Sequence, residues 1–298
     1  MKAVCIGHST YDTTLPVNEF PTENIKTRID GHIECGGGPA ANGGYLLSKW
    51  GLDTSIVSIV GNDYYGDRII EEFKGIGADT TYIEKVNNHY TSSSYIIANK
   101  SNGSRTIITS KDKPILRISK KIDLKPDVIL VDGEHPETAE EVLKENPDAI
   151  SILDAGRLND STRKLGKLST YVICSHDFAE EFTNMKTDVN NIDDLIKIYE
   201  KLKEFYKTNI IITLEEKGSF TEINGKYKII PSIKVKAIDS TGAGDIFHGA
   251  FVYFISQKYS LEQAIRYASI TAALSVTKLG ARYSIPELKE VLEYDDII

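Results

Sequence analysis

The chain has 298 residues, of which 41% are hydrophobic, and a net charge of -8. This length suits a domain with its own core, and the acidic balance argues against nucleic acid, which binds cationic surfaces. Cys5, Cys35 and Cys174 follow neither a disulfide nor a zinc spacing. The apolar start is too short for a signal peptide, and no run approaches the ~18 apolar residues of a spanning helix. We therefore expect a cytoplasmic protein that binds no membrane.

Short β-branched runs alternate with helical patterns along the chain. The predicted strands cover residues 4–7, 55–60, 128–132, 150–154, 171–174 and 210–214. Several are apolar on both faces, which is typical of buried parallel strands. Apolar residues at helical spacing predict helices, most clearly over 192–206 and 261–273. This alternation predicts an α/β fold with a doubly wound, mostly parallel sheet, helices on both faces, and ligands at the carboxyl ends of the strands.

Two stretches, about 11–35 and 88–110, lack a helix with which to cross over. The first is polar, and the second alternates like two strands around the turn at residues 100–103. We interpret both as a small β-sheet lid attached to a single domain of residues 1–298. Arg105 lies in this lid and is a candidate to contact the substrate or its phosphate.

Residues 239–249 form a glycine-rich segment that opens a helical pattern. Small residues at a helix start leave backbone N–H groups free, and together with the helix dipole they form an anion site. Phosphoryl transfer needs such donors, here the amides of Gly242, Ala243 and Gly244, and a base for the attacking hydroxyl, here Asp245. A tight turn with Asp245 as a helix cap is the alternative. A P-loop enzyme is not expected, because the chain has no GxxxxGK motif followed by Ser or Thr.

A second glycine-rich segment covers residues 36–44, with Pro39 placed to be the first residue of a helix. Gly37 and Gly38 would let the backbone approach a ligand closely. Asn42 would offer one acceptor and two donors, a combination that suits sugar hydroxyls.

The same segment satisfies a dinucleotide-binding fingerprint, GxGxxA, through Gly36, Gly38 and Ala41. Asp63 lies about 22 residues further on, where a ribose-binding acid is expected. This alternative predicts an NAD-dependent oxidoreductase. Against it, a strand is already predicted upstream at residues 4–7, and the segment 28–32 before Gly36 is polar. It also leaves residues 239–249 without a role.

Together, the two glycine-rich segments resemble those of the ribokinase-like (PfkB-type) carbohydrate kinases. Members carry a Gly-Gly motif with a nearby Asn, and an Asp-Thr-x-Gly-Ala-Gly-Asp motif towards the C-terminus. Here the second motif spans 239–245, with Ser240 in place of the usual Thr. Residues 60–67, 213–218 and 276–286 are similar to further family segments in the same order. The resemblance covers essentially the whole chain.

The resemblance implies an α/β/α sandwich, a β lid that often dimerises, and ATP with Mg²⁺ as co-substrates. It implies Asp245 as the base, with the amides of Gly242 to Gly244 binding the transferred phosphate. The other implied site residues are Asp12, Gly37, Gly38 and Asn42 for the sugar; Ser175, Thr213, Glu215, Gly218, Thr241 and Gly244 for the nucleotide; and Asp239 and Ser284 for a monovalent cation such as K⁺, which some members hold.

Three positions depart from the family pattern. Residues 175–178 stand where many members have an NxxE motif near the metal, and Glu215 replaces a glycine. Pro39 replaces a lysine of the ribokinases proper, and this difference argues against ribose itself.

From the resemblance as a whole, we expect an ATP-dependent kinase that phosphorylates a hydroxyl of a small sugar or sugar derivative, and a homodimer formed through the lid. A nucleoside kinase of the same fold stays open, with Tyr90 and Tyr95 as candidate aromatics around the lid.

Overall fold

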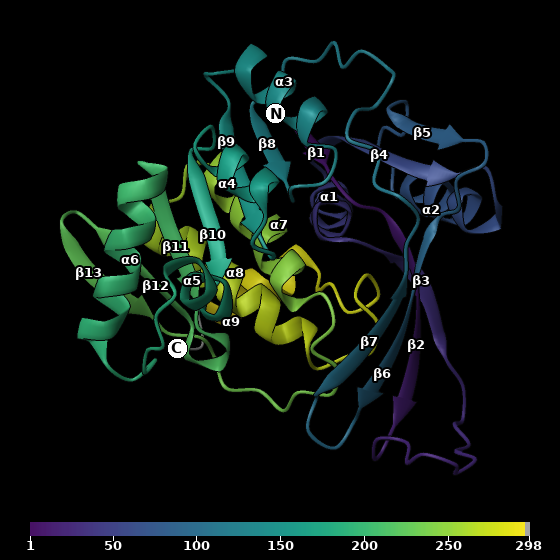
Figure 1. Ribbon diagram of the computed structural model, residues 1–298. Helices are drawn as coiled ribbons and strands as arrows, with labels where there is room; N and C mark the ends of the chain where they lie inside the picture. Colours follow the sequence, from purple (N-terminus) through teal and green to yellow (C-terminus); the bar gives the residue numbers. More distant parts are fainter. Residues whose placement is uncertain (296–298) are drawn as a thin grey trace.

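The computed structural model describes residues 1–295 and is built around one large sheet (Figure 1). In the described residues this sheet has nine strands in the order β13-β12-β11-β10-β9-β8-β1-β4-β5. The parallel strands are β1 (Lys2–Ile6), β4 (Asp53–Gly61), β5 (Ile83–Val86), β8 (Val128–Val131), β9 (Ile150–Ala155), β10 (Tyr171–Ser175) and β11 (Asn209–Thr213). The strands β12 (Ser219–Ile223) and β13 (Lys226–Ile230) extend it in antiparallel fashion. All six strands predicted for the main sheet are present.

Helices cover both faces of the sheet. On one face lie α1 (Pro39–Lys49), α2 (Tyr64–Gly75), α7 (Ala243–Ser256), α8 (Leu261–Ser275) and α9 (Leu288–Asp295). On the other lie α3 (Pro136–Glu145), α4 (Asp160–Gly166), α5 (His176–Thr183) and α6 (Ile192–Tyr206), and the short 3₁₀ helix η1 (Glu215–Lys217) follows β11. This confirms the predicted three-layer α/β/α arrangement.

Side-chain alternation in the central strands explains the two cores. In β1, Ala3 and Cys5 pack against the helices of one face, while Val4 and Ile6 pack against those of the other. Successive side chains of a strand point to opposite faces, so a strand covered on both sides must be apolar throughout. All four of these side chains are at most 2% exposed.

A separate four-stranded sheet projects from the sandwich (Figure 1). Its order is β3-β2-β6-β7, formed by β2 (Thr10–Val17), β3 (Ile33–Gly37), β6 (Ser92–Asn99) and β7 (Arg105–Ser110). The predicted small sheet is therefore present, although residues 18–32 of its first stretch form no strand. All six residues of β7 are exposed.

The strand order reverses between β8 and β1, because the chain proceeds outward from β1 to β4 and β5 and from β8 to β9, β10 and β11. Open α/β sheets bind ligands at the carboxyl ends of the strands beside such a reversal. The starts of α1 and α7 lie near this edge. Across residues 1–295, no helix combines the length and apolar character needed to cross a bilayer.

Candidate active site

The turn into α1 brings backbone close to the carboxyl end of β1. Gly38 has φ 102°, a left-handed conformation that favours glycine, and a Cβ added there would lie 2.1 Å from the carbonyl oxygen of His8. The helix begins at Pro39, as predicted. Asp132, which follows β8, accepts hydrogen bonds from the backbone N–H groups of His8 and Ala40 at 2.9 and 3.0 Å. This carboxylate ties β1, β8 and α1 together.

Two glycines allow α1 and α7 to pack closely. A Cβ added at Gly249 of α7 would lie 2.8 Å from the Cα of Gly43 in α1. The close approach brings Asn42 to Asp245, and the Asn42 Nδ2 donates a hydrogen bond to the Asp245 Oδ2 at 2.8 Å. The sequence predicted both residues as site residues, and the fold places them in contact although 203 positions separate them.

Asp245 lies in the first turn of α7 and is half-buried. Burial raises the pKa of its carboxyl group to about 7, and the charge of Asp154 adds to the rise; Asn42, His248 and Arg105 oppose it. A carboxyl group that titrates near neutral pH is well matched to accept a proton from a hydroxyl. The position and the pKa both suit a general base.

The amides at the start of α7 are available to an anion. Within residues 1–295, the backbone N–H groups of Gly242, Gly244 and Asp245 have no hydrogen-bond acceptor, whereas that of Ala243 donates to the Ser240 carbonyl oxygen at 3.4 Å. Gly244 is exposed, and no atom lies within 4 Å of the position of an added Cβ. Free amides together with the positive end of the helix dipole favour a phosphate group at this point.

Asp12, on β2 of the small sheet, is buried at 6% exposure, and its Oδ1 has no hydrogen-bond partner in the described part of the chain. Burial raises the pKa of this carboxyl group to about 6, although the hydroxyls of Ser94 and Thr10 and the charge of Arg282 lower it in part. A Cβ added at Gly37 would lie 2.0 Å from the Asp12 Oδ2. Glycine at this position is therefore what leaves room for the Asp12 carboxylate.

Arg105 connects the small sheet to the loop before α7. Its Nη1 donates a hydrogen bond to the Ser240 Oγ at 2.6 Å, and the Ser240 Oγ donates to the Gly103 carbonyl oxygen at 2.9 Å. The positive charge of Arg105 also acts on the Asp245 carboxylate. The lid residue singled out from the sequence thus lies beside the predicted phosphate-binding helix start.

Two residues of the predicted nucleotide site lie side by side at the strand ends. Ser175 and Thr213 pair in register at the carboxyl ends of β10 and β11. In the turn that follows, Glu215 has φ 52°, and a Cβ added at Gly218 would lie 2.0 Å from the Ile230 carbonyl oxygen. Thr241 is buried before α7, and its Oγ1 lacks a partner among the described residues.

The two residues predicted to hold a monovalent cation are both buried. The Asp239 carboxylate accepts hydrogen bonds from the backbone N–H groups of Thr241 and Gly280, each at 2.9 Å. The Ser284 Oγ donates to the Ala281 carbonyl oxygen at 2.9 Å. Asp239 therefore joins the two loops that flank the start of α7.

The comparisons with known proteins show the family and the fold of this chain. The model of the pfkB family of carbohydrate kinases matches residues 1–288. A ribokinase from Haemophilus influenzae is 30% identical over 267 residues, which cover 87% of this chain and 86% of that protein. A deoxyribokinase from Salmonella typhi is 27% identical over 309 residues, covering 99% and 98%. The solved ribokinase from Thermotoga maritima has a TM-score of 0.80 at 29% identity, covering 99% of both chains.

The chain belongs to the pfkB family of carbohydrate kinases. It is a sugar kinase, that is, a phosphotransferase with an alcohol group as acceptor.

The kinase does not use the dinucleotide fingerprint in the way an oxidoreductase does. The strand before Gly38 is β3, which pairs antiparallel with β2 in the small sheet rather than opening a βαβ unit of the main sheet. Asp63 caps α2 by accepting from the Gly66 N–H at 2.9 Å, and it also accepts from the Thr91 N–H at 2.8 Å. The oxidoreductase alternative is therefore wrong, because the fingerprint residues stand in a different fold context.

Three polar residues beside the kinase site were missed at the level of sequence. The buried Arg282 pairs with the half-buried Glu72 behind Asn42, with the Arg282 Nη1 2.8 Å from the Glu72 Oε2. The third residue, His248, lies with its Nδ1 3.0 Å from the Asp154 Oδ2. Burial lowers the pKa of His248, but the Asp154 carboxylate outweighs burial and raises it overall. Each pair joins residues that are far apart in the chain, so no local sequence pattern indicates either contact.

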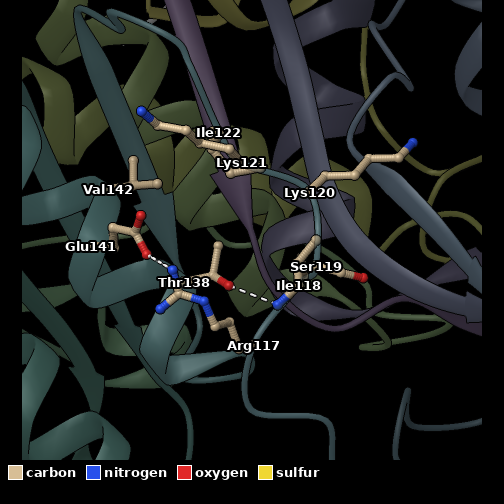
Figure 2. A pocket seen from close by; sticks show the side chains of 9 residues that line it. All are labelled: Arg117, Ile118, Ser119, Lys120, Lys121, Ile122, Thr138, Glu141 and Val142. Atoms are coloured by element: carbon tan, nitrogen blue, oxygen red, sulfur yellow. Dashed lines mark hydrogen bonds and ion pairs between the residues drawn. The ribbon is translucent and has the colours of Figure 1, made fainter.

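A pocket of about 180 Å³ lies outside this group of residues (Figure 2). Thr138 Oγ1 accepts there from the Ile118 N–H at 2.9 Å, and Arg117 forms an ion pair with Glu141. It is lined by Arg117, Ile118, Ser119, Lys120, Lys121, Ile122, Thr138, Glu141 and Val142. Typical sites for small ligands have volumes of ~300–1,000 Å³. The pocket is too small for a sugar and a nucleotide and contains none of the predicted site residues.

Proposed function

We propose that the kinase transfers the γ-phosphoryl group of ATP to a hydroxyl of a small sugar or sugar derivative, with Asp245 as the base. The observation that carries this proposal is the placement of a half-buried carboxyl group with a pKa of about 7 directly beside backbone amides that lack acceptors. A base and an anion site within one helical turn are what in-line transfer to an alcohol requires.

Proton removal and charge stabilisation are divided between side chain and backbone. Asp245 accepts the proton of the acceptor hydroxyl as its oxygen attacks phosphorus, and the Asn42 amide holds the carboxylate from the other side. The amides of Gly242 and Gly244 donate to the phosphoryl oxygens as their charge develops, which lowers the barrier only if they are already oriented. Ala243 completes this anion hole after its amide leaves the weak 3.4 Å bond to Ser240.

On the acceptor side, Asp12 and Asn42 bind sugar hydroxyls, and the absence of side chains at Gly37 and Gly38 lets the backbone approach the sugar closely. The unpartnered Oδ1 of Asp12 supports this assignment, because a buried carboxylate oxygen is expected to have a donor. Arg105 approaches from the lid and contacts the substrate or its phosphate.

On the nucleotide side, ATP lies along the carboxyl ends of β10 and β11, where Ser175, Thr213, Glu215 and Gly218 follow one another, and it reaches Thr241 at the start of α7. Phe178 is buried where many family members have a glutamate, but the neighbouring His176, Asp177 and Glu180 each offer a ligand atom within 4.8 Å of the others. Mg²⁺ often binds through phosphates and waters with only one or two carboxylates. The residues therefore fit a Mg²⁺ ion that is held mainly by the nucleotide and neutralises phosphate charge.

Two further assignments belong to this proposal. Asp239 and Ser284 hold a monovalent cation such as K⁺ next to the anion hole, and the kinase forms a homodimer through its small sheet. The exposure of apolar side chains on β7 supports the second assignment, because Ile107 is 46% and Ile108 is 60% exposed.

The test of the proposed function is Asp245→Asn. We expect turnover to fall by about 10²–10⁴-fold, the usual contribution of a general base, with the fold and ATP binding unchanged. The measurement is ADP release with ATP and a panel of sugars and nucleosides, combined with calorimetric ATP binding. Parental turnover in the variant would remove Asp245 from this role. If the parental enzyme prefers nucleosides, Tyr90 and Tyr95, which are 46% and 45% exposed, become the side chains to examine.

A further inference from the structure

A buried cation lies directly behind the site. Arg282 is 2% exposed, its Nη1 donates to the Glu72 Oε2 at 2.8 Å, and its Nε donates to the Asn42 Oδ1 at 3.2 Å. The guanidinium carbon lies 4.4 Å from the ring centre of Phe73 and 5.0 Å from that of Tyr45. A buried charge is tolerated when it is paired and hydrogen-bonded, so these contacts hold the side chain in one orientation.

The bond to Arg282 decides which way the Asn42 amide faces. A guanidinium group only donates hydrogen bonds, so the oxygen of Asn42 must face Arg282. The NH₂ group then faces the other way, where Nδ2 donates to the Asp245 Oδ2 at 2.8 Å. Turning the amide by half a turn would set its NH₂ against the N–H of Arg282 and its oxygen against the Asp245 carboxylate. Arg282 thus removes one of the two orientations.

The Glu72 end of this pair reaches the small sheet. The Glu72 Oε2 also accepts from the backbone N–H of Gly36 at 2.9 Å. A Cβ added at Gly36 would lie 2.1 Å from the Arg282 Nη1, and one added at Gly37 would lie 2.0 Å from the Asp12 Oδ2. Consecutive glycines at the end of β3 therefore give room to Arg282 and to Asp12.

We propose that Arg282, held by Glu72, is a positioning residue for phosphoryl transfer: it fixes the Asn42 amide so that this amide orients the Asp245 carboxylate towards the acceptor hydroxyl. Arg282 acts through Asn42 and contacts neither the reacting atoms nor the substrate. This inference rests on the proposed role of Asp245 as the base.

A change in pH dependence follows from the groups that face Asp245. They are Asn42 from α1, His248 from α7, Asp154 from the end of β9 and Arg105 from β7. Asn42 is the neighbour whose hydrogen bond favours the ionised carboxylate, and its donation depends on Arg282. Without Arg282 only the Asp245 carboxylate orients the amide, so the hydrogen bond between them weakens. The pKa of Asp245 then rises above about 7, and activity is lost at a higher pH as the solution is acidified.

The experiment compares Arg282→Met, Asn42→Ala and the double variant with the parental enzyme. ADP release is followed with ATP and the best acceptor among ribose, deoxyribose and fructose, from pH 5.5 to 9. We expect Arg282→Met to lower kcat by about 10–100-fold, a range typical of misplaced catalytic groups, with KM for ATP unchanged and the acid limb of kcat/KM moved to higher pH. The double variant should be no slower than Asn42→Ala alone, because the two residues act in series.

Two further variants separate positioning from folding. Arg163→Met is the control. The guanidinium of Arg163, in α4, lies 4.5 Å from the ring of Phe182 in α5, outside the candidate site, so its loss should leave kcat and the acid limb at parental values. Glu72→Gln combined with Arg282→Met removes both charges of the pair, so no unpaired carboxylate is left, and it should recover stability lost by the single variant without recovering kcat.

Parental turnover and an unmoved acid limb in folded Arg282→Met would overturn the inference, as would losses that simply multiply in the double variant with Asn42→Ala. The Asp245→Asn variant distinguishes a failure of this inference from a failure of the proposed function. If Asp245→Asn keeps parental turnover, the assignment of the base is wrong. If it is inactive while Arg282→Met is normal, only the role of Arg282 is wrong.

Discussion

The acceptor side and the phosphoryl side of this site are built from different material. On the acceptor side, Asp12, Asn42 and Arg282 are buried side chains from distant elements, held by hydrogen bonds and an ion pair. On the phosphoryl side, the start of α7 presents main-chain amides, and Gly244 is exposed with no atom near its Cβ position. The acceptor side is therefore a packed network of side chains, and the phosphoryl side is solvent-accessible main chain.

The difference follows from what each side must recognise. Phosphate oxygens carry diffuse negative charge, which the N-terminal end of a helix can meet with amides that folding has already oriented. A sugar is recognised by the positions of its hydroxyls, so its binding groups need fixed side chains with satisfied partners. We therefore expect substitutions on the phosphoryl side to lower activity without lowering stability, and substitutions on the acceptor side to lower both.

Gly244→Ala should show the largest separation of activity from stability. The new methyl group meets no protein atom, and alanine favours the helix over glycine by about 0.5–1 kcal/mol, so the free energy of unfolding should rise. The same methyl group enters the space in which the transferred phosphoryl group is proposed to sit. Turnover should therefore fall by about 100-fold, the scale seen when one oxyanion donor is lost. Thermal denaturation and ADP release measure the two effects.

Gly75→Ala is the matched control for that change. Gly75 ends α2, is exposed and likewise has no atom within 4 Å of an added Cβ, so its replacement should leave turnover at the parental value. Parental turnover in Gly244→Ala would show that the phosphoryl group does not occupy this helix start.

Gly249→Ala should damage both properties, because it acts on the acceptor side. The added methyl group would lie 2.8 Å from the Cα of Gly43 and would force α1 away from α7. Overpacking of this kind costs about 1–3 kcal/mol of stability. Lengthening the Asn42–Asp245 hydrogen bond should also lower kcat by about 10-fold. Chemical denaturation gives the first value and steady-state kinetics the second.

Gly166→Ala provides the comparison. Gly166 and Tyr206 both lie on the face of the sheet opposite to α1 and α7, and a Cβ added at Gly166 would lie 2.4 Å from the Tyr206 ring. It should lose similar stability while keeping parental kcat per folded molecule. Equal losses of kcat in both variants would mean that Gly249 matters only for folding, and that the Asn42–Asp245 contact tolerates movement.

The same contrast explains how much could be predicted from the sequence. The helix start at residues 242–245 is a local feature, so its glycines and Asp245 were found from the motif alone. The Arg282–Glu72 pair spans 210 positions, and nothing in either neighbourhood indicates the partner. Six of the seven parallel strands of the main sheet were predicted because they are continuous apolar runs, whereas β5, with Glu84 and Lys85 at its centre, was missed. The β12–β13 hairpin was missed although Asn224 and Gly225, with φ 52° and 74°, form an Asn-Gly turn signal. The polar residues that could not be predicted from the sequence are those whose partners lie far away along the chain.

Arg105 bridges the two sides, and its replacement should give the smallest effect. Arg105→Gln keeps a donor that can reach the Ser240 Oγ but removes the positive charge that lowers the pKa of Asp245. Asp245 works as a base only when ionised, so kcat/KM of the parental enzyme should fall as pH drops below about 7. In the variant the pKa is higher, so this loss should begin a few tenths of a pH unit higher, with KM for the sugar rising about 2–5-fold.

The pH dependence of kcat/KM for Arg105→Gln, measured beside Lys228→Gln as a charge control on β13, decides whether the lid charge acts on the base. Lys228 pairs with Glu262 at 2.8 Å and is not among the groups that shift the pKa of Asp245, so its removal should leave the acid limb in place. If the acid limb of the kcat/KM profile does not move in Arg105→Gln while KM for the sugar rises, Arg105 acts only in substrate binding. A moved limb would mean that the open lid sheet, and not only the packed network around Asn42, tunes the carboxylate of Asp245.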